Sequence, residues 1–372
     1  KDNIEISKKA RTVLIFTVIT TLNVMVLISI AIALRLGEKT DNSNNSKDSE
    51  KKSNSIIATY NEDNGDEVWL FNWKYTKFVS SIKVDGILIN EISEFLSFNI
   101  SGRHTVEISF KKELESTAQM FEFCSNLVEV DLSNLDTKNI NNIEDMFFEC
   151  EALTSINFKN FNTRKVTKMK NLFYRCISLN TMDLTKFDTS NVEDMSNMFF
   201  QCEALTNLNI NNFKTSKVKY MNKMFYDCYL IKSLDLSNFD TSNVVNMEGM
   251  FSLCENLQKI NLNNFDTSKV TDISYMFGAN YALTSVNLSS FKTNQVIKMT
   301  NMFYSCQELK VLNISNFDTS KVESMGEIFG KCSSLTTIDI RNFNSLSLKE
   351  NKNLFNEINN SSGIIYFNSQ IF

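Results

Sequence analysis

The sequence predicts an α/β repeat fold, a solenoid with about ten parallel strands and one helix in each repeat. Two observations lead to this prediction. The chain repeats itself every 26 residues without an insertion or deletion, and two hydrophobic rhythms alternate inside each period. Phenylalanine marks the period at Phe121, Phe147, Phe173, Phe199, Phe225, Phe251, Phe277, Phe303, Phe329 and Phe355. All eight cysteines lie three residues after one of these, at Cys124, Cys150, Cys176, Cys202, Cys228, Cys254, Cys306 and Cys332. Asn280 stands where the register would place a ninth.

The period from Leu236 to Leu262 contains both hydrophobic rhythms. Its first rhythm has the spacing i, i+3, i+4, i+7 and i+10, in Met247, Met250, Phe251, Cys254 and Leu257. This spacing predicts one face of a helix. The second rhythm, from Leu257 to Phe265, reads L-x-x-I-x-L-x-x-F and matches the strand segment of a leucine-rich repeat. We therefore expect a leucine-rich-repeat solenoid whose sheet lines its concave side, because packed helices need more room than strands.

The repeated phrase also resembles a known family. Read from Phe239 to Cys254, it is F-D-T-S-x-V-x-x-M-x-x-M-F-x-x-C. This resembles the BspA-like leucine-rich-repeat surface proteins of low-GC bacteria, mycoplasmas and several protists, over about residues 116 to 367. The resemblance implies an extracellular, surface-held protein that functions in adhesion or binding. Repeats specify a scaffold more than a site, so the resemblance names no ligand.

The first part of the chain predicts a membrane anchor. Residues 1–11 form a short cytoplasmic tail in this interpretation, and residues 12–36 form a transmembrane signal-anchor. Thr12 to Leu34 carries no charge over a length that spans the ~30 Å hydrocarbon core. The basic cluster at Lys8, Lys9 and Arg11 favours a cytoplasmic N-terminus with the repeats outside. The alternative is a cleaved secretory signal and a secreted protein.

The polar segment 37–55 is typical of a disordered linker. Residues 56–115 predict a small β domain that shields the open end of the first repeat, although a ligand-binding module is an alternative. Within it, Asp85-Gly86 and Ser101-Gly102 each predict a hairpin turn. The solenoid is expected over residues 116–345, and residues 346–372 form a C-terminal partial repeat or cap.

Several kinds of chemistry are not expected. The net charge is −5 with both signs interspersed, which argues against nucleic-acid binding. No cofactor motif, metal site or catalytic set is found, because the chain has no C-x-x-C and its one histidine, His104, lies at a predicted turn. The cysteines are expected as buried free thiols rather than disulfides, since helices ~8–10 Å apart exceed the ~7 Å limit for a bridge.

The candidate binding surface is the solvent-facing side of the predicted sheet. One polar residue faces outward between the two inward residues of each strand, and Ser233 and Lys259 flank two of these positions. The candidates are Asp131, Asn157, Asp183, Asn209, Ser233, Asp235, Lys259, Asn261, Asn287, Asn313 and Asp339. No two aspartates are adjacent, so we expect asparagine side chains to bridge neighbouring carboxylates across the strands.

The sequence thus favours a membrane-anchored cell-surface protein, not an enzyme, that binds a macromolecule or mediates adhesion through its concave sheet. The expected partner is an extracellular or host protein or glycan. An alternative is a structural surface-coat protein without a specific ligand. A third is an enzyme whose catalytic part lies outside this chain.

Overall fold

The computed structural model describes residues 54–63, 65–344, 353–355 and 364–366. The described chain begins with a small sheet region, residues 55–110. Its elements are β1 (Ser55–Glu62), β2 (Glu67–Trp69), the 3₁₀ helix η1 (Trp73–Phe78), β3 (Val79–Val84), β4 (Ile87–Leu88), β5 (Phe95–Ser97) and β6 (Gly102–Phe110). Val106 and Ile108 are buried on the inner face of β6, where the alternation of the sequence places them.

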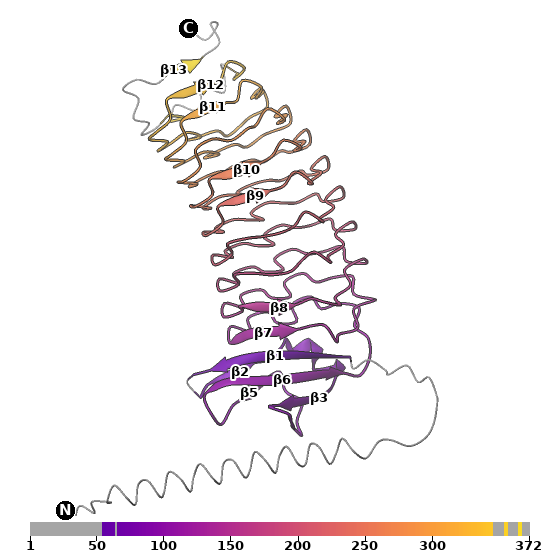
Figure 1. The fold of residues 1–372 in the computed structure, drawn as a ribbon. Helices are drawn as coiled ribbons and strands as arrows, with labels where there is room; N and C mark the ends of the chain where they lie inside the picture. The colour runs from indigo at the N-terminus through magenta and orange to yellow at the C-terminus, as the bar shows by residue number, and fades with distance from the viewer. Residues whose placement is uncertain (1–53, 64, 345–352, 356–363, 367–372) are drawn as a thin grey trace, which may run out of the picture. The chain divides into compact units, whose positions relative to one another are not determined.

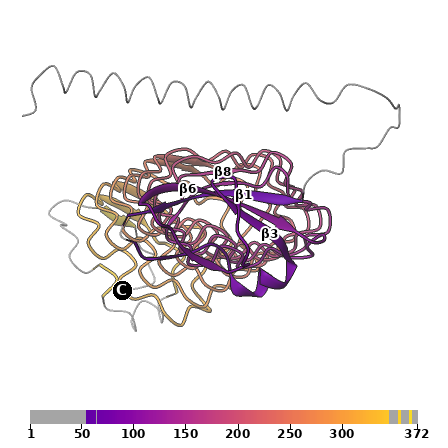
Figure 2. The ribbon, with the colours of Figure 1, turned by 90° about the horizontal axis from the view of Figure 1, so that it is seen from below.

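The repeats follow as a stack of irregular turns, and we call each 26-residue repeat a rung (Figure 1). The strands along one side of the stack are β7 (Leu127–Asp131), β8 (Ser155–Asn157), β9 (Ser233–Asp235), β10 (Lys259–Asn261), β11 (Val311–Asn313), β12 (Thr337–Asp339) and β13 (Ile364–Tyr366). They pair in parallel as β7 with β8, β9 with β10, and β11 with β12 and β13. Viewed along the stack, successive rungs lie over one another (Figure 2).

The two regions share one sheet of six strands, in the order β4-β3-β6-β1-β7-β8. β1 lies antiparallel to β7, so the backbone edge of the first rung is paired rather than open. Asp85 and Gly86 both have positive φ in the hairpin between β3 and β4, which confirms the predicted turn. The hairpin predicted at Ser101-Gly102 is wrong, because β5 pairs with β2 and β6 pairs with β1 and β3.

The prediction of a leucine-rich-repeat solenoid with one helix in each repeat is wrong. In the described part of the chain the only helix is η1, which precedes the first rung. The strands are short and fall into separate groups of two or three rather than one row of about ten. The expected concave sheet loses its basis as well, since that curvature was inferred from the packing of helices.

The segment expected to be helical is a series of tight turns. Between Met221 and Ile231, four backbone N–H groups donate to the carbonyl three residues back, at 3.2–3.3 Å. An α-helix instead bonds to the residue four back. Lys223 and Asp227 have φ of 54° and 55°, and equivalent residues in the other rungs are also left-handed. A right-handed helix does not admit such residues.

The N–H groups between these turns bond to the next rung. Met221, Lys223, Phe225 and Asp227 donate to carbonyls 25 residues ahead, at 2.8–3.1 Å. The same pattern recurs from rung to rung. Backbone groups that a helix would satisfy internally are therefore shared between neighbouring repeats, which holds the rungs in register.

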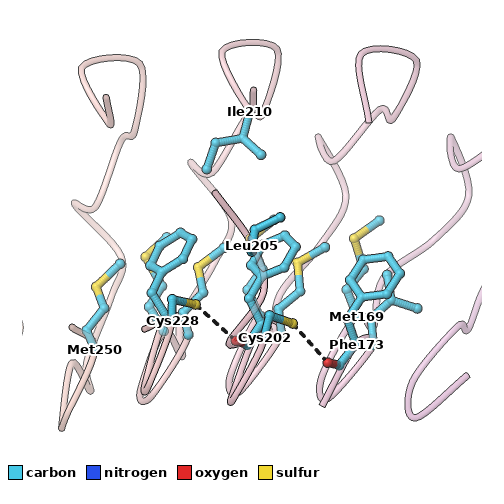
Figure 3. Close-up of a cluster of buried hydrophobic side chains, with 14 of the residues drawn as sticks. Met169, Phe173, Cys202, Leu205, Ile210, Cys228 and Met250 are labelled. Atoms are coloured by element: carbon cyan, nitrogen blue, oxygen red, sulfur yellow. Dashed lines mark hydrogen bonds between the residues drawn. The ribbon is translucent and has the colours of Figure 1, made fainter. Parts of the chain in front are cut away.

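Apolar side chains fill the interior of the stack in columns. The phenylalanines that mark the period are fully buried from Phe121 to Phe329, and their rings stack with centroids 5.4–6.2 Å apart. All eight cysteines are buried free thiols. Cys202 and Cys228 each donate their S–H group to the carbonyl of a phenylalanine in the preceding rung, at 3.2 Å (Figure 3).

A column of buried threonines satisfies further backbone groups. The Thr215 hydroxyl donates to the carbonyl of Asp240 at 2.9 Å and accepts from the N–H of the same residue at 2.8 Å. The equivalent threonine of neighbouring rungs does the same, as at Thr189 and Thr241. The threonine of the repeated F-D-T-S phrase thus pairs with the backbone of the next rung and does not cap a helix.

The membrane assignment also needs correction. The predicted tail (1–11), transmembrane segment (12–36) and linker (37–55, as far as residue 53) lie outside the described residues. Within the described ranges, no helix is long and apolar enough to cross a bilayer. No described helix therefore supports the predicted single-pass membrane protein with its repeats at the cell surface, and we do not retain that assignment.

Gly249 offers a test of the turn geometry. Its φ is +59°, and an added Cβ would lie 3.2 Å from Cγ of Lys223. We expect Gly249→Ala to lower the free energy of unfolding by about 1–2 kcal/mol, the cost of a left-handed alanine. In a helix the same change would raise it by about 1 kcal/mol. Chemical denaturation shows whether the free energy of unfolding falls or rises. Gly326→Ala is the control, since its φ is not positive and a Cβ there meets open space. A stabilised Gly249→Ala variant would contradict the turns.

The thiols give a second test. Adjacent rungs are close enough for a disulfide, so helix spacing no longer argues against one. Burial raises the pKa of Cys254 to about 12, and only the thiolate reacts readily. We expect slow labelling of the folded protein and labelling of all eight thiols after denaturation without reductant, counted by mass spectrometry. Fewer than eight would show that some cysteines are bridged.

Candidate functional site

The residues proposed for binding lie along the strand side of the stack. We call the eleven residues from Asp131 to Asp339 named above the strand row. Nine of them are exposed, and Asp131 and Asp339 are partly buried. Paired strands place Asp131 beside Asn157, Ser233 beside Lys259, Asp235 beside Asn261, and Asn313 beside Asp339. Asp183, Asn209 and Asn287 hold the equivalent repeat position in rungs where the described chain forms no named strand.

Each Asp or Asn of the strand row bonds to its own backbone. Its side-chain Oδ1 accepts the N–H of the residue two positions on, at 2.7–3.3 Å. This is the local turn that short polar side chains favour at the end of a strand. For example, Asp183 accepts from Thr185 N–H at 2.9 Å, and Asp235 accepts from Ser237 N–H at 3.1 Å. The bond holds each side chain in one orientation.

These bonds also hold the carboxylates in their charged form. The side chain and backbone of Thr185 lower the pKa of Asp183, and those of Ser237 lower the pKa of Asp235. The expected bridging of carboxylates by asparagines is largely replaced by these local bonds, although Asn157 does contribute a bond that lowers the pKa of Asp131. The Asp and Asn positions of the strand row therefore present fixed negative charges separated by neutral amides.

Asp339 differs from the rest of the strand row. The Arg341 guanidinium donates from Nη2 to Oδ2 of Asp339 at 2.7 Å and from Nε to Oδ1 at 2.9 Å. This two-point contact lowers the pKa of Asp339. Its carboxylate is therefore engaged within the protein, and it is a weak candidate for contact with a partner.

The sequence interpretation missed a second ordered surface. Phe148, Tyr174, Phe200 and Tyr226 are partly buried, and their rings stack with centroids 4.5–4.6 Å apart and planes within 5°. Each directly follows a core phenylalanine at the same 26-residue spacing, so the column is visible in the sequence. The ring faces contact one another, which leaves mainly edges to solvent. We interpret this column as packing rather than as a site.

His104 is not the turn residue that the sequence suggested. It lies in β6 with its side chain 12% exposed and stacks on Phe98 with ring centroids 4.1 Å apart. Its Nδ1 is 2.8 Å from Oδ2 of Asp85, and its Nε2 is 2.6 Å from the carbonyl oxygen of Ile100. Both neighbours are acceptors, so the protonated ring satisfies both. The bond to Asp85 raises the pKa of His104, and the bond to His104 lowers the pKa of Asp85.

Across the described ranges, no group of three His, Cys, Asp or Glu side chains is arranged to hold a metal ion. The strand row, the aromatic column and the His104 pair are three ordered features outside the core that the fold brings together.

A comparison with models of protein families finds one family that matches the repeats. The model described as "Mycoplasma protein of unknown function, DUF285" matches residues 115–234, 203–311 and 280–366. The chain belongs to this family. The three matches overlap and together cover the rungs from first to last, as a repeat family should. DUF285 membership establishes the repeat character, and the BspA-like assignment stays a prediction. No curated protein matches the chain.

The His104 pair predicts a pH dependence. Because the folded pKa of His104 is raised, its contribution to stability is complete below the unfolded value of about 6.5 and is lost as the pH rises through the folded value. We expect the difference in unfolding free energy between wild type and His104→Gln to shrink from about pH 6 upward. Lys83→Gln, which removes the Lys83–Glu107 ion pair of the same sheet, should show no such change there. A His104→Gln difference that stays constant from about pH 5 to pH 9 would contradict the assignment.

Proposed function

We propose that this DUF285 protein is a non-catalytic scaffold that binds a macromolecule, an extended protein or glycan, along its strand row. The proposal rests on the row of Asp and Asn side chains, one from each rung, each of which accepts the backbone N–H of the residue two positions on. Strand pairing spaces such residues by ~4.8 Å. A long ligand would meet many similar contacts in sequence.

The chemistry of the strand row suits weak contacts repeated many times. The Asp and Asn side chains are short, and their turns already restrict them, so binding would order little that is mobile. No large aromatic anchor of the kind that dominates tight interfaces belongs to the row. Affinity would therefore come from the number of rungs engaged. The resemblance of the repeat phrase to BspA-like proteins, which implies binding or adhesion, supports the same function.

A second candidate function is a structural protein without a specific ligand. One observation favours it: every Asp and Asn of the strand row has a role within its own turn. Those side chains would be needed even if nothing bound. The two candidates differ in whether the charge of the row matters for anything besides folding.

Charge reversal in two rungs tests the proposal. The double variant Asp183→Lys/Asp235→Lys is compared with wild type by surface plasmon resonance over an array of purified matrix proteins and polysaccharides. We expect it to lose at least about tenfold in affinity for the probe that wild type binds, which corresponds to about 1.4 kcal/mol. The reason is that two fixed negative charges become positive in the middle of the row.

The matched control is Asp188→Lys/Asp240→Lys. These aspartates lie in the same two rungs outside the strand row and accept the N–H of Ser190 and Ser242 in the same kind of turn. Both double variants lose two such turns, and both change the net charge by the same amount. Equal binding by both double variants, with equal unfolding midpoints, would place the contact elsewhere. No binding of wild type to any probe would favour the structural protein.

A further inference from the structure

A cavity of about 340 Å³ lies where the N-terminal sheet region meets the first rung. Its walls come from η1 and from residues 112–116, the segment that follows β6. Tyr75, Phe78 and Leu114 form the apolar side of the cavity, and Tyr75 and Leu114 are buried. The volume falls in the lower part of the range for sites of small organic ligands. This cavity is separate from the strand row.

Three lysines line the cavity, and two of them share one ring. Nζ of Lys77 lies 5.0 Å from the centroid of the Phe78 ring, and Nζ of Lys112 lies 5.4 Å from the same centroid. Nζ of Lys74 lies 5.5 Å from the Tyr75 ring and donates to Oε1 of Gln119 at 2.7 Å. Among the described residues, none of these three lysines is within ion-pair distance of a carboxylate. A ring face attracts a cation without neutralising it, so the charges stay available.

The carboxylates of the same cavity do not balance these charges. Glu113 accepts from Lys138 Nζ and, at 2.8 Å, from Asn139 Nδ2, so it is engaged by the next rung. Of the carboxylates that line the cavity, only Glu115, an exposed side chain, then remains to balance the charge of the three lysines. Partial burial removes water from the Lys74 ammonium and lowers its pKa, and the carboxylates of Glu122 and Asp145, which do not line the cavity, offset only part of this effect. An anion placed here would compensate that loss of hydration.

We propose that this cavity binds the tetrahedral oxyanion of a small organic ligand, a phosphate or sulfate ester of about monosaccharide size. The ester oxygens contact the ammonium groups of Lys74, Lys77 and Lys112. The carrier of the ester packs on the apolar side formed by Tyr75, Phe78 and Leu114.

The type of cation favours a tetrahedral anion over a planar carboxylate. A carboxylate is best matched by the flat fork of arginine, and no arginine lines the cavity. Lysine acts as a compact point charge and suits phosphate in any orientation. Lys77 and Lys112, which come from two chain segments, lie on one ring, and Lys74 lines the same cavity, so each of the three charges is offered to a separate oxygen of one tetrahedral group.

The full chain carries its own reporter for this test. Trp73, the first residue of η1, directly precedes the cavity residue Lys74 and is 69% exposed. Tryptophan fluorescence is followed at low salt during titration with glucose 6-phosphate, glucose 6-sulfate, inorganic phosphate, glucuronate and glucose. We expect saturable binding of the two esters with Kd in the millimolar range or tighter, and weaker binding of inorganic phosphate, glucuronate and glucose. The relative affinity of the two esters shows which of them is the preferred source of the oxyanion.

Two double variants locate the response. Lys77→Gln/Lys112→Gln should lower the affinity for the better ester at least about tenfold. Lys217→Gln/Lys269→Gln should leave it unchanged, because those lysines donate to amide oxygens of the stack and the change in net charge is the same. Thermal melting checks that both variants fold. Equal affinity of the Lys77/Lys112 variant and wild type would overturn the proposal. So would glucuronate binding as tightly as the esters, or no saturable response to any anion.

Discussion

The hydrogen bond from a backbone N–H to the carbonyl 25 residues ahead is the interaction on which the stack depends. It replaces the internal bonds of a helix with bonds between repeats, so a rung satisfies its backbone only when neighbours are present. The buried phenylalanine, cysteine and threonine columns can line up because this ladder fixes one register for all rungs. The antiparallel pairing of β1 with β7 serves the same need at the first rung.

The period and the buried columns could be read from the sequence, whereas the conformation between them could not. Apolar residues at i, i+3, i+4 and i+7 fit a helix, but they also fit consecutive tight turns that place every fourth residue on the same side. Backbone φ separates the two. One signal of the turns was present in the sequence. The position that Lys223 holds in its rung has positive φ, and in other rungs it is occupied by Asp145, Asn171, Asn197, Gly249 and Asn301. These are the residue types that adopt positive φ most readily. The Asp85-Gly86 turn was predicted correctly for the same reason.

The strand row shows how far sequence reasoning reaches for a site. The outward position of Asp183 or Asp235 follows from alternation along a short strand and needs no knowledge of the turns. The bond of each carboxylate to the residue two positions on depends on local backbone geometry, which alternation does not report. The cavity at Phe78 was beyond prediction, because its lysines come from two segments that only the folded sheet region brings together. His104 was misplaced because β5 pairs with β2, which changes the neighbours of β6.

The uniform length of the rungs has a consequence for how such a protein can change. Each internal rung donates and accepts the same set of bonds, as the threonine and cysteine contacts show at successive repeats. A duplication or loss of one whole repeat would join a rung to another with matching donors, acceptors and columns. A single-residue insertion would instead move every later contact out of step. Chain length in this architecture can therefore vary through recombination between repeats, in whole units, while the two ends stay the same.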